Sequence, residues 1–140
     1  MSDTELLVGL LAAEHAAIYA YGVLGARLDE ATRAMALTAF DAHRTLRSAL
    51  RVQLQARGVE PPGPLAAYDI TVRDRAQALR LAIDLEVKDG VLWRDLVATS
   101  EDPALRSMAV PALAGTAVRA ARWRKVAGVR PLTEAFPGQA

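Results

Sequence analysis

The sequence predicts an all-α protein, a four-helix bundle with one longer crossover loop between the second and third helices. Two observations lead to this prediction. Four segments repeat apolar residues at alternating spacings of three and four, which marks one face of an α-helix. No stretch shows the apolar–polar alternation of a β-strand. Because the chain has 140 residues and 52% of them are hydrophobic, we expect residues 1–140 to form one domain with a sizeable core.

Capping signals bound the first two predicted helices. The first is expected over about residues 3–28 and opens at Ser2, with Glu5 three residues later. This spacing is that of a capping box, in which each residue satisfies a backbone N–H of the other. The second helix is expected over about residues 30–57, because Gly58 is a residue type favoured just after a helix C-terminus.

The clearest break in the chain lies between Glu60 and Pro64, where three prolines fall within four residues. Proline cannot occupy a helix interior without removing a hydrogen bond and clashing with the preceding turn. We therefore expect the longer crossover loop here. Thr71 is expected to cap the third helix, over about residues 72–99.

The fourth helix is expected over about residues 103–127, with Asp102 as its N-cap. Pro111 lies inside this range and is expected to kink the helix or to split off a short first turn. The remaining residues, 128–140, are expected to form an extended tail anchored by Phe136.

The composition excludes several classes of function. With 17 Lys and Arg residues against 16 Asp and Glu, the net charge is +1, so we expect neither nucleic acid nor a membrane surface as a partner. The absence of cysteine excludes disulfides, thiol catalysis and zinc sites with cysteine ligands. No uncharged apolar run reaches the roughly 18 residues of a transmembrane helix. The acidic N-terminus is also unlike a signal peptide, so we expect a cytoplasmic protein.

Alanine is very frequent, whereas aromatic residues make up only 5% of the chain. Alanine is the best helix former, and its small side chain lets helices approach closely. Helix faces rich in alanine, or faces that carry tyrosine, therefore predict a homodimer. A small apolar ligand inside an alanine-lined bundle is a further possibility for a partner.

Polar residues interrupt each apolar stripe near its middle. They are Glu14 in the first helix, His43 and Arg47 in the second, Glu86 in the third and Arg119 in the fourth. Burying an unpaired charge is strongly unfavourable. We therefore expect these five residues to form a buried polar network, in which the charges meet each other, a metal ion or water.

Other polar residues are expected outside this network. His15 adjoins Glu14 but points about 100° away around the helix, so we expect it at the surface or in an interface. Asp84, Asp89 and Asp95 are expected to form a solvated face of the third helix. No arrangement of serine, histidine and acid, and no glycine-rich phosphate loop, can be recognised.

Four stretches carry a resemblance to known proteins: Ala13–Gly22, His43-Arg44, Trp123-Arg124 and Thr133–Gly138. With these stretches the chain resembles the ferritin-like superfamily, and more closely the small alanine-rich ferritin-like domains of unknown function found in actinobacteria. The di-iron members of the superfamily use one Glu from each of two helices and a Glu-x-x-His from each of the other two. The resemblance places Glu14 and Glu86 at the single-glutamate positions and His43 at a histidine position.

The departures from the di-iron pattern bear directly on the chemistry. The position of the glutamate three residues before His43 is occupied by Phe40. Between Pro103 and Thr133 there is no Glu, Asp or His, and Arg119 stands near the position of the missing ligands. At most three of six ligands are retained, which is too few to hold two bridged irons.

Two interpretations of the centre follow. In the first, Glu14 and Glu86 pair with Arg47 and Arg119, and His43 hydrogen-bonds within the network. The chain is then a non-catalytic protein with a structural or binding role, no catalytic residue and no cofactor. Its di-metal site is vestigial.

In the second interpretation, Glu14, His43 and Glu86 form a mononuclear metal site that water completes. Two carboxylates and one imidazole suit iron or manganese. The chain is then a metal-binding ferritin-like protein or an oxidase. A third hypothesis is a carrier that holds a small apolar ligand within the bundle.

Overall fold

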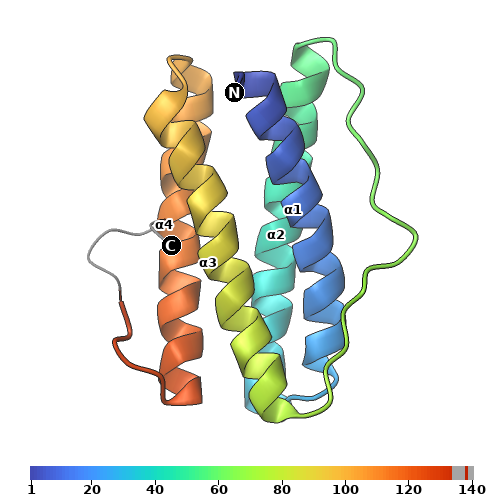
Figure 1. Cartoon of the computed structure of the whole chain (residues 1–140), viewed down its shortest axis with the longest axis vertical. Helices are drawn as coiled ribbons and strands as arrows, with labels where there is room; N and C mark the ends of the chain where they lie inside the picture. Colours follow the sequence, from blue (N-terminus) through green and yellow to red (C-terminus); the bar gives the residue numbers. More distant parts are fainter. Residues whose placement is uncertain (134–137, 139–140) are drawn as a thin grey trace.

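The computed structural model describes residues 1–133 and residue 138. Its four helices are α1 (Asp3–Gly25), α2 (Glu30–Ala56), α3 (Arg75–Thr99) and α4 (Pro103–Ala127) (Figure 1). The predicted all-α four-helix bundle is therefore confirmed, and the described residues contain no strand. The expected anchor of the tail, Phe136, lies outside the described residues.

The four helices form two antiparallel hairpins, α1 with α2 and α3 with α4 (Figure 1). The crossover between the hairpins runs along the whole length of the bundle, from the end of α2 to the start of α3. The hairpins join mainly through α1 and α3, whereas α2 and α4 touch only sparsely. The seam between α2 and α4 is therefore the least tightly closed side of the bundle.

The capping groups follow the sequence closely at three of the four helix starts. In α1, the Ser2 hydroxyl accepts a hydrogen bond from the Glu5 backbone N–H at 3.1 Å, and the Glu5 carboxylate accepts one from the Ser2 N–H at 2.8 Å. Asp29 caps α2 and Asp102 caps α4. At the end of α4, Gly128 adopts a left-handed conformation with φ of 72°, which glycine reaches without a steric cost.

Two predicted helix ends are wrong by about one turn. Asp74, and not Thr71, caps α3, because the Asp74 carboxylate accepts the Gln77 backbone N–H at 2.8 Å. At the end of α1, the backbone N–H groups of Arg27 and Leu28 bond to carbonyls only three residues earlier, so the chain turns after Gly25. Pro111 does not split α4, which runs unbroken from Pro103 to Ala127.

Two apolar clusters fill the core, one toward each end of the bundle, and both draw on several helices. The cluster at the N-terminal end of α1 is dominated by leucines: Leu6, Leu7, Leu10, Leu11, Leu50, Leu54, Leu96 and Leu105. The other cluster combines alanines with larger side chains, including Tyr21, Leu24, Ala78, Ala82 and Trp123. On every helix, the polar residues predicted to be buried lie between these two clusters.

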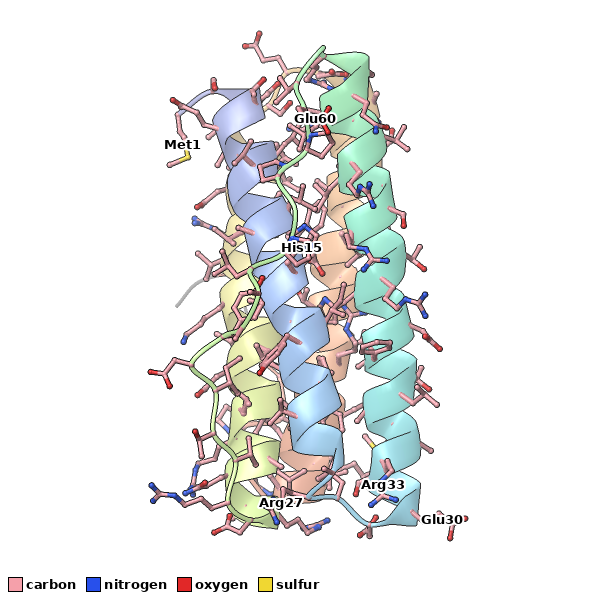
Figure 2. The ribbon with its side chains drawn as sticks, turned by 90° about the vertical axis from the view of Figure 1, so that its right-hand side faces the viewer. Met1, His15, Arg27, Glu30, Arg33 and Glu60 are labelled. Atoms are coloured by element: carbon pink, nitrogen blue, oxygen red, sulfur yellow. The ribbon has the colours of Figure 1, made fainter. Side chains whose placement is uncertain are left out.

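The crossover is tied to α1 by side chains from both segments. The His15 Nε2–H donates to the Pro62 carbonyl at 3.0 Å, and only 7% of His15 is exposed (Figure 2). The predicted surface position of His15 is therefore wrong, since the crossover covers it. The ring of Tyr19 contacts that of Tyr68 at a centroid distance of 5.1 Å. These contacts explain how a long proline-rich segment follows one path over the bundle.

Helix α1 is long and apolar enough to cross a membrane, with a mean hydropathy of 1.5 over its best 18-residue window. Every such window contains Glu14, so this finding is compatible with the absence of an uncharged run. Half of the window is buried inside the bundle. The apolar surface of α1 is thus largely used as core.

Candidate functional site

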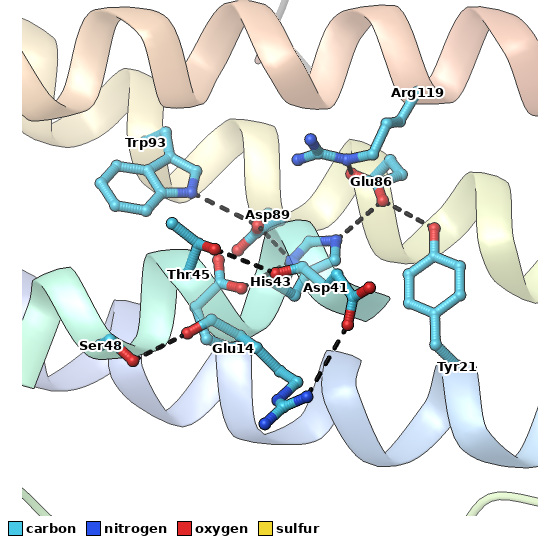
Figure 3. Close-up of polar contacts among 11 residues, drawn as sticks. Glu14, Tyr21, Asp41, His43, Thr45, Ser48, Glu86, Asp89, Trp93 and Arg119 are labelled. Atoms are coloured by element: carbon cyan, nitrogen blue, oxygen red, sulfur yellow. Dashed lines mark hydrogen bonds and ion pairs between the residues drawn. The ribbon is translucent and has the colours of Figure 1, made fainter. Parts of the chain in front are cut away.

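The middle of the bundle holds a polar cluster to which all four helices contribute: Glu14 from α1, His43 from α2, Glu86 and Asp89 from α3, and Arg119 from α4 (Figure 3). The carboxylates and the imidazole are at most 2% exposed. We call these five residues the central cluster. Its members lie in a region of low dielectric, where each charge needs a partner.

The imidazole of His43 lies between two carboxylates. Its Nδ1 is 2.6 Å from Glu14 Oε2, and its Nε2 is 2.8 Å from Glu86 Oε1. Burial lowers the pKa of His43, but hydrogen bonds to Glu14 and Glu86 and the charges of these two groups outweigh it, and the pKa rises to about 10. His43 is therefore an imidazolium that donates from both ring nitrogens.

Glu86 is the most highly connected acid of the central cluster. Besides His43, its Oε1 accepts the Tyr21 hydroxyl at 2.6 Å, and its Oε2 accepts Arg119 Nε at 3.0 Å. Burial raises the pKa of Glu86, but the hydrogen bond and charge of His43, followed by the charge of Arg119, hold it below its usual value. Glu86 therefore remains a carboxylate although its side chain is fully buried.

Tyr21 links the central cluster to the apolar core beneath it. Its hydroxyl donates to Glu86 and accepts the Trp123 indole N–H at 3.0 Å. Its ring stacks against the His43 imidazole at a centroid distance of 5.5 Å. Burial, and after it the charge of Glu86, raises the pKa of Tyr21 well above its ordinary value. Tyr21 is thus a neutral donor that orients Glu86.

Asp89 is the residue that sequence reasoning missed. The prediction of a solvated face is wrong for Asp89, because only 2% of it is exposed and its Oδ2 accepts the Trp93 indole N–H at 3.3 Å. Burial, together with the charge of and hydrogen bond to Glu14, raises its pKa well above the usual value. The spacing of Glu86 and Asp89, three residues apart on one helix, could have indicated that both face inward.

The structure separates the two arginines that were expected to act alike. Arg119 binds Glu86, whereas Arg47 is half-buried and forms no ion pair with any described residue. The Nε atom of Arg47 is buried and has no hydrogen-bond partner among the described residues. His43, and not Arg47, bonds to both Glu14 and Glu86. Arg47 is therefore outside the observed network.

One part of the central cluster has the spacing of a cation site. Glu14, His43 and Asp89 each offer a ligand atom, and these atoms lie within 4.8 Å of one another. Glu14 Oε1 and Asp89 Oδ1 are buried without hydrogen-bond partners among the described residues. Glu86 is bound to the opposite ring nitrogen of His43. The acid that converges with Glu14 at Nδ1 is thus Asp89 and not Glu86.

The chain is similar to a known protein family and to a protein of known structure. A family described as a domain of unknown function, DUF4439, matches residues 7–140. The chain is 38% identical to a conserved hypothetical protein from Mycobacterium tuberculosis whose crystal structure is known. The two structures superpose with a TM-score of 0.86 over 96% of each chain. No match is found among the curated proteins.

Proposed function

The chain belongs to the DUF4439 family of domains of unknown function, and we propose that it is a non-catalytic, ferritin-like bundle with a vestigial di-metal centre. Its own cations take the place of the metal ions. Its role is structural or binding, in the cytoplasm, and no step of catalysis is assigned to the central cluster.

The topology supports the ferritin-like part of the proposal. Two antiparallel hairpins joined by one long crossover make up the bundle, and ferritin-like folds have one such crossover. Glu14, His43 and Glu86 project into the bundle centre from three different helices, as the ligands of a di-iron centre do.

The positions of the positively charged side chains support the second part of the proposal, that the di-metal centre is vestigial. Two buried carboxylates at close range disfavour joint ionisation unless positive charge lies between them. Here the His43 imidazolium bonds to both Glu14 and Glu86, and Arg119 bonds to Glu86 from the fourth helix. The two carboxylates are thereby balanced by two cations of the chain itself.

Metal analysis tests this proposal. The protein is produced in medium supplemented with iron and manganese, purified without chelators and measured by inductively coupled plasma mass spectrometry. We expect metal far below one ion per chain, and the same low value in Glu86→Gln. A stoichiometric ion in the wild-type protein would overturn the vestigial centre.

A specific observation favours a second candidate, a mononuclear site for iron or manganese. Glu14, His43 and Asp89 each offer a ligand atom, and these atoms lie within 4.8 Å of one another. Each of the two carboxylates also has a buried oxygen without a hydrogen-bond partner among the described residues. Two carboxylates and one imidazole suit these metals. Glu86 would then be the outer partner that holds the other ring N–H of His43 in place, an arrangement common to metal-bound histidines.

The second candidate is separated from the first by a matched pair of variants on α3. Asp89→Asn removes one proposed ligand charge at a buried position, whereas Asp84→Asn changes an exposed residue of the same helix. If the site binds metal, titration with Mn²⁺ followed by electron paramagnetic resonance detects one bound ion in the wild type and in Asp84→Asn, and none in Asp89→Asn. Equal weak binding by all three proteins would eliminate the mononuclear site.

A further inference from the structure

A second feature of the bundle is an apolar cleft along α3 and α4. Its volume is about 380 Å³, which lies at the low end of the range for small-molecule sites, roughly 300–1,000 Å³. The walls come from Val87, Gly90, Ala117, Val118, Ala120 and Ala121. Thr133 and Gly138 of the tail also line it. We call this the α3–α4 cleft.

Small residues create the α3–α4 cleft. At Gly90 a Cβ atom would lie 3.0 Å from Thr116 Oγ1, so the two helices approach closely there. One turn further along α4, the alanine side chains are too short to fill the space between the helices. Gly138, with φ of +85°, packs against Gly90 and Arg94 of α3. The cleft is thus bounded by three segments of the chain.

The charges around the cleft have an uneven distribution. Arg122 and Arg124 line it, and Arg122 is exposed and forms no ion pair with any described residue. Among the described residues of the lining, the acid is Glu86, which is buried and already balanced by His43 and Arg119. An occupant therefore meets apolar walls and a positively charged edge.

We propose that the α3–α4 cleft binds a small amphiphile with an apolar chain and a carboxylate group, such as a medium-chain fatty acid. The chain lies on the alanine and valine walls, where burial of apolar surface drives binding. The carboxylate faces Arg122, whose guanidinium can bind it in a bidentate manner. Val118, 48% exposed, leaves part of the wall open to solvent for entry.

This proposal does not depend on the state of the central cluster. The cleft and the cluster share Glu86, but the atoms proposed to hold the ligand belong to α3 and α4 residues outside the cluster. A metal ion at Glu14, His43 and Asp89 would leave Arg122 and the alanine wall unchanged. A negative result in the ligand titration would therefore leave the proposed vestigial centre unaffected, and a stoichiometric metal ion would leave the proposed ligand site unaffected.

The test is isothermal titration calorimetry of the full chain with decanoate, decanol and decyltrimethylammonium, each below its micellar concentration. We expect decanoate to bind at one site per chain. Decanol is expected to bind about two- to five-fold more weakly, since an exposed charge pair contributes only modestly. The cationic amphiphile is expected to bind most weakly. Absence of decanoate binding, or equal binding of all three, would overturn the proposal.

Variants locate the site. Ala121→Phe fills the cleft and is expected to abolish decanoate binding, whereas Ala114→Phe places the same side chain at an exposed position of α4 and should have no effect. Arg122→Gln should weaken decanoate but leave decanol unchanged, and Arg51→Gln, an exposed arginine on α2, serves as its control. Circular dichroism verifies folding of each variant. If Ala114→Phe and Ala121→Phe reduce binding equally, the cleft is not the binding site.

Discussion

The leucine-rich cluster and the central cluster are filled by the same four helices, a few turns apart, with opposite kinds of side chain. In the first, Leu10, Leu50 and Leu96 are fully buried and need no partner beyond contact with other apolar atoms. In the second, Glu14 and Glu86 are buried to the same degree and each is held by the His43 imidazolium. Side chains that are equally buried therefore have different requirements: the leucines need only apolar contacts, whereas the glutamates need a positively charged partner.

The leucine-rich cluster depends on volume, and the central cluster depends on protonation and on the direction of hydrogen bonds. Apolar packing tolerates replacements that conserve size. A buried charge pair fails when a single partner is removed, because the remaining charge is left in low dielectric. We therefore expect the two regions to respond differently to pH and to single substitutions.

The largest expected difference is in the pH dependence of stability. His43 has an ordinary pKa of 6.5 and a folded-state pKa of about 10, so its contribution is complete below pH 6.5 and is lost as the pH rises to 10. By linkage, the loss amounts to up to about 5 kcal/mol of unfolding free energy. Urea unfolding between pH 6 and 10 measures it.

The groups that face His43 are Glu14 from α1, Glu86 and Asp89 from α3, and Arg119, which acts through Glu86. The raised pKa of Asp89 favours its protonated form in the fold, so its contribution is lost as the pH rises above its ordinary value of 3.8. The lowered pKa of Glu86 acts oppositely, and its contribution is lost as the pH falls below 4.5. An alkaline slope that persists in His43→Gln would assign the effect elsewhere.

The next largest effect is expected for Glu86→Ala, which leaves His43 and Arg119 without their shared carboxylate. We expect a loss of about 3–5 kcal/mol in unfolding free energy at pH 7, as for other broken buried ion pairs. Asp84→Ala, an exposed acid on the same helix, should change stability by less than about 0.5 kcal/mol. Similar losses of unfolding free energy in Glu86→Ala and Asp84→Ala would mean that the interactions of Glu86 with His43 and Arg119 do not stabilise the fold.

A comparable but pH-independent effect is expected in the leucine-rich cluster. Leu50→Ala creates a cavity at a fully buried position and should cost about 2–5 kcal/mol. Leu37→Ala changes a leucine of α2 that is 60% exposed, and it should have little effect. Thermal and urea unfolding at pH 6 and pH 9 should give the same difference between Leu50→Ala and the wild type. A pH-dependent difference would show that the two clusters are coupled.

The smallest effect is expected at the end of the bundle. Ser2→Ala removes the hydroxyl that accepts the Glu5 N–H, and should lower the unfolding free energy by about 1 kcal/mol. Thermal unfolding of this variant beside Thr4→Ala, which lies in the first turn but is not the cap, isolates the contribution of the capping box. A larger loss in Thr4→Ala would contradict the capping assignment.

Most of the fold could be predicted from local patterns, because helix periodicity and capping residues act over a few residues. The N-caps Ser2 and Asp102 are examples. Thr71 failed as a cap because Asp74, three residues later, offers a carboxylate to the Gln77 N–H. The failure shows that a capping pattern identifies a region and that competition between neighbouring acceptors decides the residue.

The central cluster was only partly accessible to prediction. Glu14, His43, Glu86 and Arg119 stood out because each interrupts an apolar stripe on its own helix. Asp89 did not, since it was grouped with Asp84 and Asp95, which are both more exposed. In the fold, Asp89 interacts with Trp93 and with Glu14, and Glu14 belongs to α1, far from Asp89 in the sequence.

By itself, the sequence determined four helices, their break at the prolines, the absence of thiol chemistry and four of the polar residues that meet in the centre, Glu14, His43, Glu86 and Arg119. These properties follow from backbone geometry that repeats every 3.6 residues and from composition. Only the tertiary structure decided that His43 lies between Glu14 and Glu86, that the crossover covers His15 and that Arg47 has no acidic partner among the described residues. The physical reason is the precision that each property requires. An apolar stripe only defines which side of one helix faces the core. A hydrogen bond between two helices requires donor and acceptor atoms to be placed to within a few tenths of an ångström.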